Sequence, residues 1–276
     1  SEASKFADVW LAPKQGTDAA LAMAMGHVIL REWHAANRSD YFTDYCRRYT
    51  DMPMLVKLVK RDGRLVADRF IRASDFADNI GQATNPEWKT VVFDEKAGHV
   101  VVPTGTVGSR WGDPGKWNLE NKATSGAHIT ARLSLMDVRD EVASVAFPYF
   151  GNIAHAHFQN TDHASILERN VPVKKMALRD GETLVATVYD LFLAHYGIDR
   201  GLGGGNVATS LDDDVPYTPA WQERITGVPR ERAVSVAREF ADNAHKTHGK
   251  SMVILGAAVN HWYHADMNYR AIINML

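Results

Sequence analysis

The sequence predicts an α/β protein made of three segments. Apolar residues with helical spacing fill both ends, in residues 1–53 and 217–276. Residues 54–216 lack that spacing and carry three hairpin signals, in which alternating apolar runs flank a turn that contains glycine. The two ends are expected to be Rossmann-like, because the apolar run at residues 252–255 (MVIL) is typical of a strand buried in a parallel sheet.

The composition is that of an ordinary globular protein. The chain has 276 residues, 45% hydrophobic and 23% charged, enough for one large domain or two small ones. Its formal net charge of −2 provides no basic field for nucleic acid or an anionic membrane. The single cysteine, Cys46, excludes an internal disulfide framework and a cysteine-held iron–sulfur cluster within this stretch. No apolar run approaches the ~20 residues that span a bilayer, so direct membrane insertion is not expected.

Both ends of the chain are unusual. There is no initiator methionine, and the start (SEASKFADVWLAP) has neither the basic region nor the apolar core of a signal peptide. The last residues (AIINML) continue an apolar helical pattern without a polar tail. We therefore expect an internal piece of a longer polypeptide.

Residues 1–53 predict a short strand, a loop and two helices. VWLAP is the expected strand, and Thr17 or Asp18 is expected to cap the long helix that follows. A second helix is expected to begin near Ser39 and to end before Pro53. The apolar face of the first helix comprises Leu21, Ala24, Met25, Val28 and Ile29.

Residues 54–216 predict hairpins separated by irregular chain. Turns are expected at Asp62-Gly63, Ala97-Gly98 and Asp180-Gly181. The third hairpin runs into a helical pattern, YDLFLAHYG. Residues 104–170 are rich in glycine, asparagine, histidine and tryptophan and have little periodicity, so we expect irregular structure there.

Residues 217–276 predict two helices, the apolar strand and a last helix. Thr218 is the expected cap of the first helix, with Pro219 at its first position and Gly227 at its end. Pro229 is expected to start the second helix. The apolar face of that helix comprises Val234, Val236, Ala237 and Phe240.

Two suggestive motifs have simpler interpretations. The run GLGGGN at residues 201–206 lacks the lysine of a P-loop and the spacing of a dinucleotide-binding turn, so it is interpreted as a flexible loop. The chain has 12 histidines, but no group has a known zinc spacing, so no metal ligand is assigned. The groups considered were His155, His157 and His163 near Asp162, and the pair His261 and His264.

Two stretches carry candidate site chemistry. In PKQGTDAAL, Gly16 permits a tight turn, and the helix N-terminus offers N–H groups to an anion such as pyrophosphate. The Asp18 carboxylate can pair with the two adjacent donors on one edge of guanine, although a plain helix cap is the simpler interpretation of this stretch alone. Asn260 and His261 follow the expected strand, where α/β sheets bind ligands. An amide and an imidazole there can donate hydrogen bonds and transfer protons, and a packed surface turn explains them about equally well.

The stretches together resemble a known family. ADVWLAPKQGTDAALAMAMGHVILREW, YTPAWQERITGVPRERAVSVAREFA and SMVILGAAVNHWYHADMNYRAIINML are similar, in that order, to segments of the molybdopterin-guanine-dinucleotide oxidoreductases, the dimethyl sulfoxide reductase family. Within it, YFTDYCRRYTDMPMLV, NPEWKTVVF, WGDPGKWNLE, FPYFGN and NHWYHADMNYR resemble the branch formed by the catalytic alpha subunits of membrane-bound respiratory nitrate reductases. The resemblance runs from residue 1 to residue 276.

The resemblance implies the central portion of a large, multi-domain molybdopterin oxidoreductase. Such an enzyme reduces nitrate to nitrite and water at a molybdenum bis(molybdopterin guanine dinucleotide) centre, with electrons from quinol. The aspartate that ligates molybdenum and the 4Fe-4S cluster are expected upstream, so we expect the piece to be inactive alone. The implied partners are an iron–sulfur beta subunit and a haem-bearing membrane gamma subunit at the cytoplasmic face of the bacterial inner membrane, with no nucleic acid.

The first matching motif implies a nucleotide-binding role. Gln15, Gly16, Thr17 and Asp18 match the guanine-nucleotide segment of the family. Asp18 is expected to bind the guanine, and Thr17 is expected to assist it.

The last matching motif implies a role beside the metal. Gly256, Asn260 and His261 match the turn that faces the molybdenum and the pterins. His261 is expected to donate hydrogen bonds or transfer protons there without ligating the metal. Tyr263 and His264 are expected to contact His261 and its neighbours and not the metal centre itself.

Three alternatives stay open. Another oxyanion reductase of the same branch, acting on selenate or chlorate, shares the architecture. A non-redox module that binds guanine nucleotides through Asp18 is the second. A hydrolase that depends on a metal held by the histidines is the third.

Overall fold

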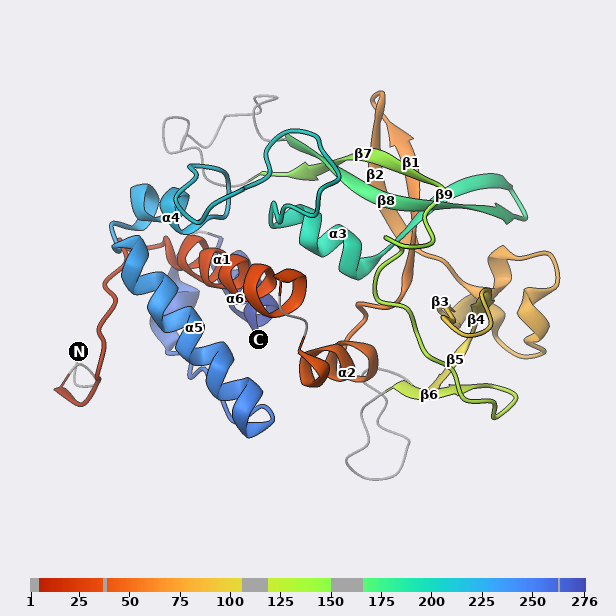
Figure 1. Cartoon of the computed structure of the whole chain (residues 1–276), viewed down its shortest axis with the longest axis horizontal. Helices are drawn as coiled ribbons and strands as arrows, with labels where there is room; N and C mark the ends of the chain where they lie inside the picture. The colour runs from red at the N-terminus through yellow and green to blue at the C-terminus, as the bar shows by residue number, and fades with distance from the viewer. Residues whose placement is uncertain (1–4, 37–38, 106–118, 150–165, 263) are drawn as a thin grey trace.

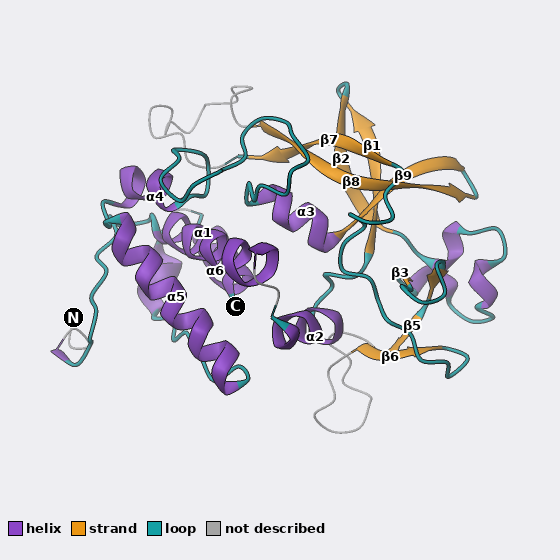
Figure 2. Cartoon of the chain, viewed as in Figure 1, coloured by secondary structure: helices purple, strands orange, loops and turns teal. Residues whose placement is uncertain are grey.

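A five-stranded β-barrel and a group of packed helices stand side by side in this chain (Figure 1). The computed structural model describes residues 5–36, 39–105, 119–149, 166–262 and 264–276. Helix α3 (Val188–His195) lies between the barrel and the helices, and Figure 2 shows the division into strands and helices. The prediction of an α/β protein is confirmed in this coarse form, as a mixed sheet with helices. The three-segment division stays a prediction.

The barrel is closed in the order β1-β2-β7-β8-β9. All its strand pairs are antiparallel except β2 with β7, which is parallel at Leu65 and Val145. Apolar side chains of the strands and of α3 form one core, with Val145 and Val171 fully buried. The strands are β1 (Leu55–Arg61), β2 (Arg64–Phe70), β7 (Glu141–Pro148), β8 (Ile166–Leu178) and β9 (Gly181–Thr187).

The hairpin predictions are largely confirmed. Asp62 and Gly63, with φ of 49° and 78°, form the turn between β1 and β2. The second hairpin joins β3 (Val92–Phe93) and β4 (Val100–Val101) around Gly98, which has φ of 70°. The third turn consists of residues 179–180, one residue earlier than predicted, because Gly181 already pairs with Leu178.

The prediction of irregular structure over residues 104–170 is partly wrong. Strands β5 (Pro103–Gly105) and β6 (Leu119–Ala123) form a small sheet there, and β7 and the first part of β8 belong to the barrel. Strand β7 (EVASVAFP) buries residues from both strand faces, so its sequence lacks clean alternation and period 2 is hard to detect. Short 3₁₀ turns occupy Ala73–Asp75, Asn79–Gly81 and Pro86–Trp88.

The helices begin and end close to where their capping residues predict. Ser39 accepts a hydrogen bond from the Phe42 N–H at the start of α2, and Thr218 accepts one from the Trp221 N–H at the start of α4. Gly227 ends α4 in the left-handed conformation, with φ of 77°. The helices are α1 (Asp18–Ile29, continued by a π-helical segment, Leu30–Ala36), α2 (Asp40–Tyr49), α4 (Pro219–Thr226), α5 (Arg230–Thr247) and α6 (Ala265–Met275).

The helices pack around α1, which touches α4, α5 and α6 (Figure 1). The side of α1 that carries Met25 and Val28 packs on Val234 and Ala237 of α5, so the apolar faces predicted for both helices meet. Another part of its surface, at Ala22, packs on α6. This arrangement brings the first and the last helix of the chain together.

The two strands predicted for the chain ends are absent from the described residues. Residues 252–255 form no strand and pair with no described strand, and Met252 and Ile254 are 76% and 82% exposed. The VWLAP stretch likewise leaves Val9 and Trp10 exposed and unpaired with any described strand. A strand forms only where a neighbour satisfies its backbone groups, and the described chain provides none at either place.

Candidate functional site

A tight turn, residues 14–17, leads into α1. Gly16 has φ of +75°, a conformation that favours glycine. The N–H and the Oγ1 of Thr17 both donate to the Lys14 carbonyl, at 3.1 and 2.6 Å. Because its hydroxyl closes the turn, Thr17 does not cap α1 with its side chain, which corrects one of the two capping residues considered.

The turn is attached to α4 on one side. The Lys14 N–H donates to the carbonyl of Thr226, the last residue of α4, at 2.9 Å. The end of α4 is itself locked, because the Thr226 hydroxyl donates to Gln222 at 2.7 Å and accepts from the Val228 N–H at 3.0 Å. Gln222 and Thr226 are fully buried. The position of the turn therefore depends on a rigid helix end.

The turn is attached to α6 on the other side. Asn268 of α6 is 3% exposed, and its Oδ1 accepts from the Ala19 N–H of α1 at 3.0 Å. The Trp262 ring covers Gly16, since a Cβ on this glycine would stand 3.7 Å from the indole. The first and last predicted motifs therefore meet. Trp262 and Asn268 make the junction, and sequence reasoning gave neither a role.

Several backbone N–H groups at the turn are available to a ligand. Within the described part of the chain, the N–H groups of Gln15, Gly16 and Asp18 have no acceptor. Asp18 is the first residue of α1 and is half-buried, while Gln15 and Gly16 are exposed. Free N–H groups at a helix start are suited to an anion, and the neighbouring carboxylate is suited to a group with paired donors.

The residues predicted to face a metal lie in an exposed turn. Gly256 precedes the 3₁₀ turn Ala257–His261, and Gly256, Asn260 and His261 are exposed. His264 follows in the left-handed conformation at the start of α6, and its carbonyl accepts from the Asn268 N–H. Tyr263 lies outside the described residues. The turn is close in the chain to Trp262, and the role of His261 stays a prediction.

The histidine groups do not form a metal site in the part of the chain that is described. No three residues among the described histidines, cysteines, aspartates and glutamates converge as metal ligands. His155, His157, Asp162 and His163 fall outside the described residues. Cys46 is buried, and burial raises the pKa of its thiol to about 12.

The glycine run at residues 201–206 is held in place. Asn170 of β8 donates from its Nδ2 to the Leu202 carbonyl at 2.9 Å, and a Cβ on Gly204 would stand 2.9 Å from the Asn170 amide. The loop follows α3 on the barrel side and contains none of the residues of the turn before α1. The interpretation as a loop agrees with this placement, although the loop is anchored.

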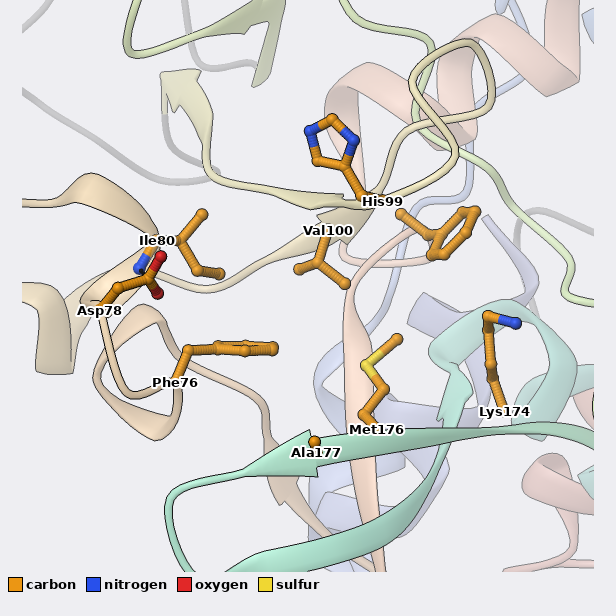
Figure 3. Close-up of a pocket in the computed structure, with 9 residues that line it drawn as sticks. Phe76, Asp78, Ile80, His99, Val100, Lys174, Met176 and Ala177 are labelled. Carbon is orange, nitrogen blue, oxygen red and sulfur yellow. Dashed lines mark hydrogen bonds between the residues drawn. The ribbon is translucent and has the colours of Figure 1, made fainter.

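A cavity of about 520 Å³ lies away from these motifs (Figure 3). Side chains from β8, the β3–β4 hairpin and the 3₁₀ turns converge on it, among them Phe76, Ile80 and Met176. Its walls are mostly apolar, with Lys174 on one side. None of the predicted site residues lines it.

Among the described residues, no helix combines the length and the apolar character that crossing a membrane would need.

The match to a family model covers the whole chain. The molybdopterin oxidoreductase model matches residues 1–276. The chain therefore belongs to the molybdopterin oxidoreductase family, and membership implies a molybdopterin cofactor. Because the turn before α1 joins the two motifs that the family resemblance singled out, we treat it as the candidate cofactor site and call residues 14–18 the cofactor loop.

The relatives in that family are reductases of oxyanions. Respiratory nitrate reductase 1 alpha chain and respiratory nitrate reductase 2 alpha chain of Escherichia coli (strain K12) are 58% and 59% identical over all of this chain. Perchlorate reductase subunit alpha of Dechloromonas aromatica (strain RCB) is 27% identical over 96% of it. The chain spans 22% of the length of each E. coli relative and 21% of the perchlorate reductase subunit.

Proposed function

We propose that this chain is a central part of the catalytic subunit of a respiratory nitrate reductase. The observation that carries the proposal is the identity of 58% to a respiratory nitrate reductase alpha chain over the full length of the chain, without a segment left unmatched. The parent enzyme would reduce nitrate to nitrite and water, using two protons and two electrons that come from quinol.

The cofactor loop fits a guanine dinucleotide. Its three available N–H groups suit the pyrophosphate, and glycine at position 16 permits the φ of +75° that the turn requires. The Asp18 carboxylate can accept from the two donors of guanine, and Thr17 holds the turn that presents it. When bound, the molybdenum–pterin group supplies the redox chemistry, and the loop supplies binding and orientation.

The exposed turn that follows Gly256 is proposed to complete the site. Asn260 can donate a hydrogen bond from its amide, and the imidazole of His261 can hold or transfer a proton near neutral pH. Neither residue ligates the metal in this proposal. The aspartate ligand of molybdenum and the 4Fe-4S cluster are proposed to belong to other parts of the parent subunit.

The parent subunit is proposed to work in a complex. An iron–sulfur beta subunit would deliver electrons, and a haem-bearing gamma subunit in the membrane would take them from quinol. The complex would stand at the cytoplasmic face of the bacterial inner membrane. The E. coli relatives are named alpha chains, which supports the presence of further subunits.

A second oxyanion is the main competing substrate. The match to a perchlorate reductase subunit, at 27% identity, supports a reductase of chlorine oxyanions less strongly than the nitrate reductase matches support nitrate. Steady-state kinetics of the parent enzyme with nitrate, chlorate and selenate separates these substrates, and a higher kcat/KM for nitrate is expected.

The proposal is tested with the full-length parent protein. Molybdenum is measured by elemental analysis and nitrate reduction with a reduced viologen dye, in wild type, Asp18→Ala and His261→Ala. We expect Asp18→Ala to lose molybdenum and His261→Ala to keep molybdenum and lose turnover at least ~100-fold. A wild-type protein without molybdenum that still binds guanine nucleotides would leave only the binding module.

Matched controls are available in the chain. Asp40 is the first residue of α2, as Asp18 is of α1, so Asp40→Ala removes the same favourable interaction with a helix dipole away from the site. His128 is an exposed histidine that pairs with Lys122 of β6, outside the helical group. His128→Ala is therefore the control for His261→Ala. Both controls are expected to keep molybdenum and turnover.

A further inference from the structure

One buried arginine joins the barrel to the helices. Arg169 of β8 is 1% exposed, and it forms no ion pair with a carboxylate among the described residues. Its guanidinium donates to three backbone carbonyls instead, of His195, Asn206 and Pro216. We call this group the Arg169 hub.

The surroundings of the Arg169 guanidinium are suited to a buried cation. Nε donates to Asn206 at 2.8 Å and one terminal nitrogen to Pro216 at 3.3 Å, while the other bonds His195 at the end of α3. That helix end carries the negative pole of the helix dipole, which favours a cation. A Cβ on Gly197 would stand 2.8 Å from the guanidinium, so only glycine leaves room for it. Burial lowers the pKa of Arg169 to about 10, so it remains charged near neutral pH.

The three carbonyls belong to three different segments. His195 ends α3, Asn206 ends the glycine run, and Pro216 lies two residues before Thr218, the cap of α4. The Arg169 carbon Cζ also stands 5.7 Å from the centre of the Tyr217 ring, next to Pro216. The arginine is therefore one of the groups that hold the chain where it enters α4, together with the Thr218 hydroxyl, which donates to the Asp213 carbonyl at 2.7 Å.

The far end of α4 holds the cofactor loop. Thr226, the last residue of α4, accepts the Lys14 N–H at 2.9 Å. Between the two ends, α4 is a single helix whose Trp221 is 2% exposed and packs edge-on against Tyr217. Helix α4 therefore connects Pro216 at one end with Lys14 at the other.

We propose that Arg169 is a positioning residue for the cofactor loop, acting through Pro216, α4 and Thr226. The inference rests on the proposed function only for what the loop binds. The mechanical link itself concerns described residues alone. Arg169 touches no ligand in this proposal.

The link is tested by hydrogen exchange of the Lys14 amide in the full-length protein. Arg169→Met removes the donors and keeps much of the side-chain volume. We expect the Lys14 amide to exchange about tenfold faster or more, since weakening its anchor by about 1.4 kcal/mol gives that factor. Arg169→Lys keeps the charge but not the planar fork, and is expected to fall between Arg169→Met and wild type.

A destabilised barrel gives the matched control. Val171→Ala empties part of the barrel core two residues along β8 and has no connection to α4. If Arg169→Met and Val171→Ala accelerate exchange at Lys14 equally at equal loss of melting temperature, Arg169 is only a structural residue and the proposal is wrong. Faster exchange at Lys14 in Arg169→Met alone supports it.

Cofactor retention distinguishes failure of the link from failure of the proposed function. Guanine nucleotide released by acid is measured in wild type and both variants, with loss expected in Arg169→Met and not in Val171→Ala. A wild-type protein that releases no guanine nucleotide overturns the proposed function, while the exchange experiment still decides the link. Normal retention in Arg169→Met overturns the positioning role.

Discussion

The barrel and the helical group differ in how completely they bury their apolar residues. Each barrel strand has two neighbours, and Val145 and Val171 are fully buried between them. In the helical group, residues 252–255 are all apolar, yet Ile254 is 82% exposed. Only Val253 packs inwards, against Ala22 and its neighbours.

The candidate site therefore belongs to the helical group, the region that leaves more of its apolar residues exposed. A two-sided apolar segment is typical of a strand in a parallel sheet, and the described residues provide no strand to pair with it. The E. coli relatives are more than four times as long as this chain, so a parent protein of that length would have other segments available for that sheet. The cofactor loop therefore depends on neighbours more than the barrel does.

The largest expected contrast compares charges placed in the two regions. In the 276-residue chain, Val171→Asp places an unpaired carboxylate in the barrel core and is expected to lower the free energy of unfolding by about 4 kcal/mol or more. Ile254→Asp in the same chain is expected to change it by less than about 0.5 kcal/mol. Urea unfolding followed by tryptophan fluorescence measures both.

The full-length protein should reverse the result for Ile254. If a sheet covers this residue there, Ile254→Asp is expected to destabilise the full-length protein and to reduce its molybdenum content severely. Equal, small effects of Ile254→Asp in the 276-residue chain and in the full-length protein would contradict the claim that a sheet covers residues 252–255, because the segment would then be an exposed loop in both.

Low pH is expected to destabilise the contact between the helical group and the barrel, because a buried histidine lies there. His27 of α1 is fully buried, its Nδ1 bonds the Tyr196 carbonyl at 2.8 Å, and burial lowers its pKa from 6.5 to about 4. The folded protein holds His27 neutral, whereas the unfolded chain binds a proton below pH 6.5. Stability is therefore full above pH 6.5 and falls as the pH drops towards 4, by about 3 kcal/mol for this group.

A variant measures this contribution. His27→Gln is expected to flatten the decline of unfolding free energy between pH 6.5 and 4, measured by urea titration of the 276-residue chain at several pH values. Some slope will remain, because burial also lowers the pKa of His195 to about 4. His128→Gln, on an exposed residue, is expected to leave the slope unchanged, and an unchanged slope in His27→Gln would contradict the account.

The smallest expected effect compares two glycines with nearly the same conformation. Gly16 in the cofactor loop and Gly63 in the β1–β2 turn have φ of +75° and +78°. Alanine at either is expected to cost about 1 kcal/mol of unfolding free energy, because both require the left-handed region. Gly16→Ala also brings a Cβ to 3.7 Å from Trp262, whereas Gly63→Ala meets nothing within 4 Å.

The two glycines should separate in the full-length protein. Only Gly16→Ala is expected to reduce the molybdenum content, measured by elemental analysis. Equal molybdenum in both variants would mean that the loop conformation does not matter for the cofactor.

Local signals were predictable from the sequence, and tertiary ones were not. The Asp62-Gly63 turn and the Thr218 cap depend on a few adjacent residues, so the sequence alone indicates them. Pairing of residues 252–255 depends on neighbours that the pattern cannot specify. The contacts that assemble the site, Asn268 with Ala19 and Trp262 with Gly16, join residues about 250 positions apart and have no local signature.

The most direct measurement is the guanine nucleotide content of the purified full-length protein. Nucleotide released by acid is quantified per polypeptide in wild type, Asp18→Ala and Asp40→Ala. The account predicts guanine nucleotide in stoichiometric amounts in wild type and Asp40→Ala, with a loss in Asp18→Ala. Equal guanine content in all three proteins would contradict the assignment of the cofactor loop.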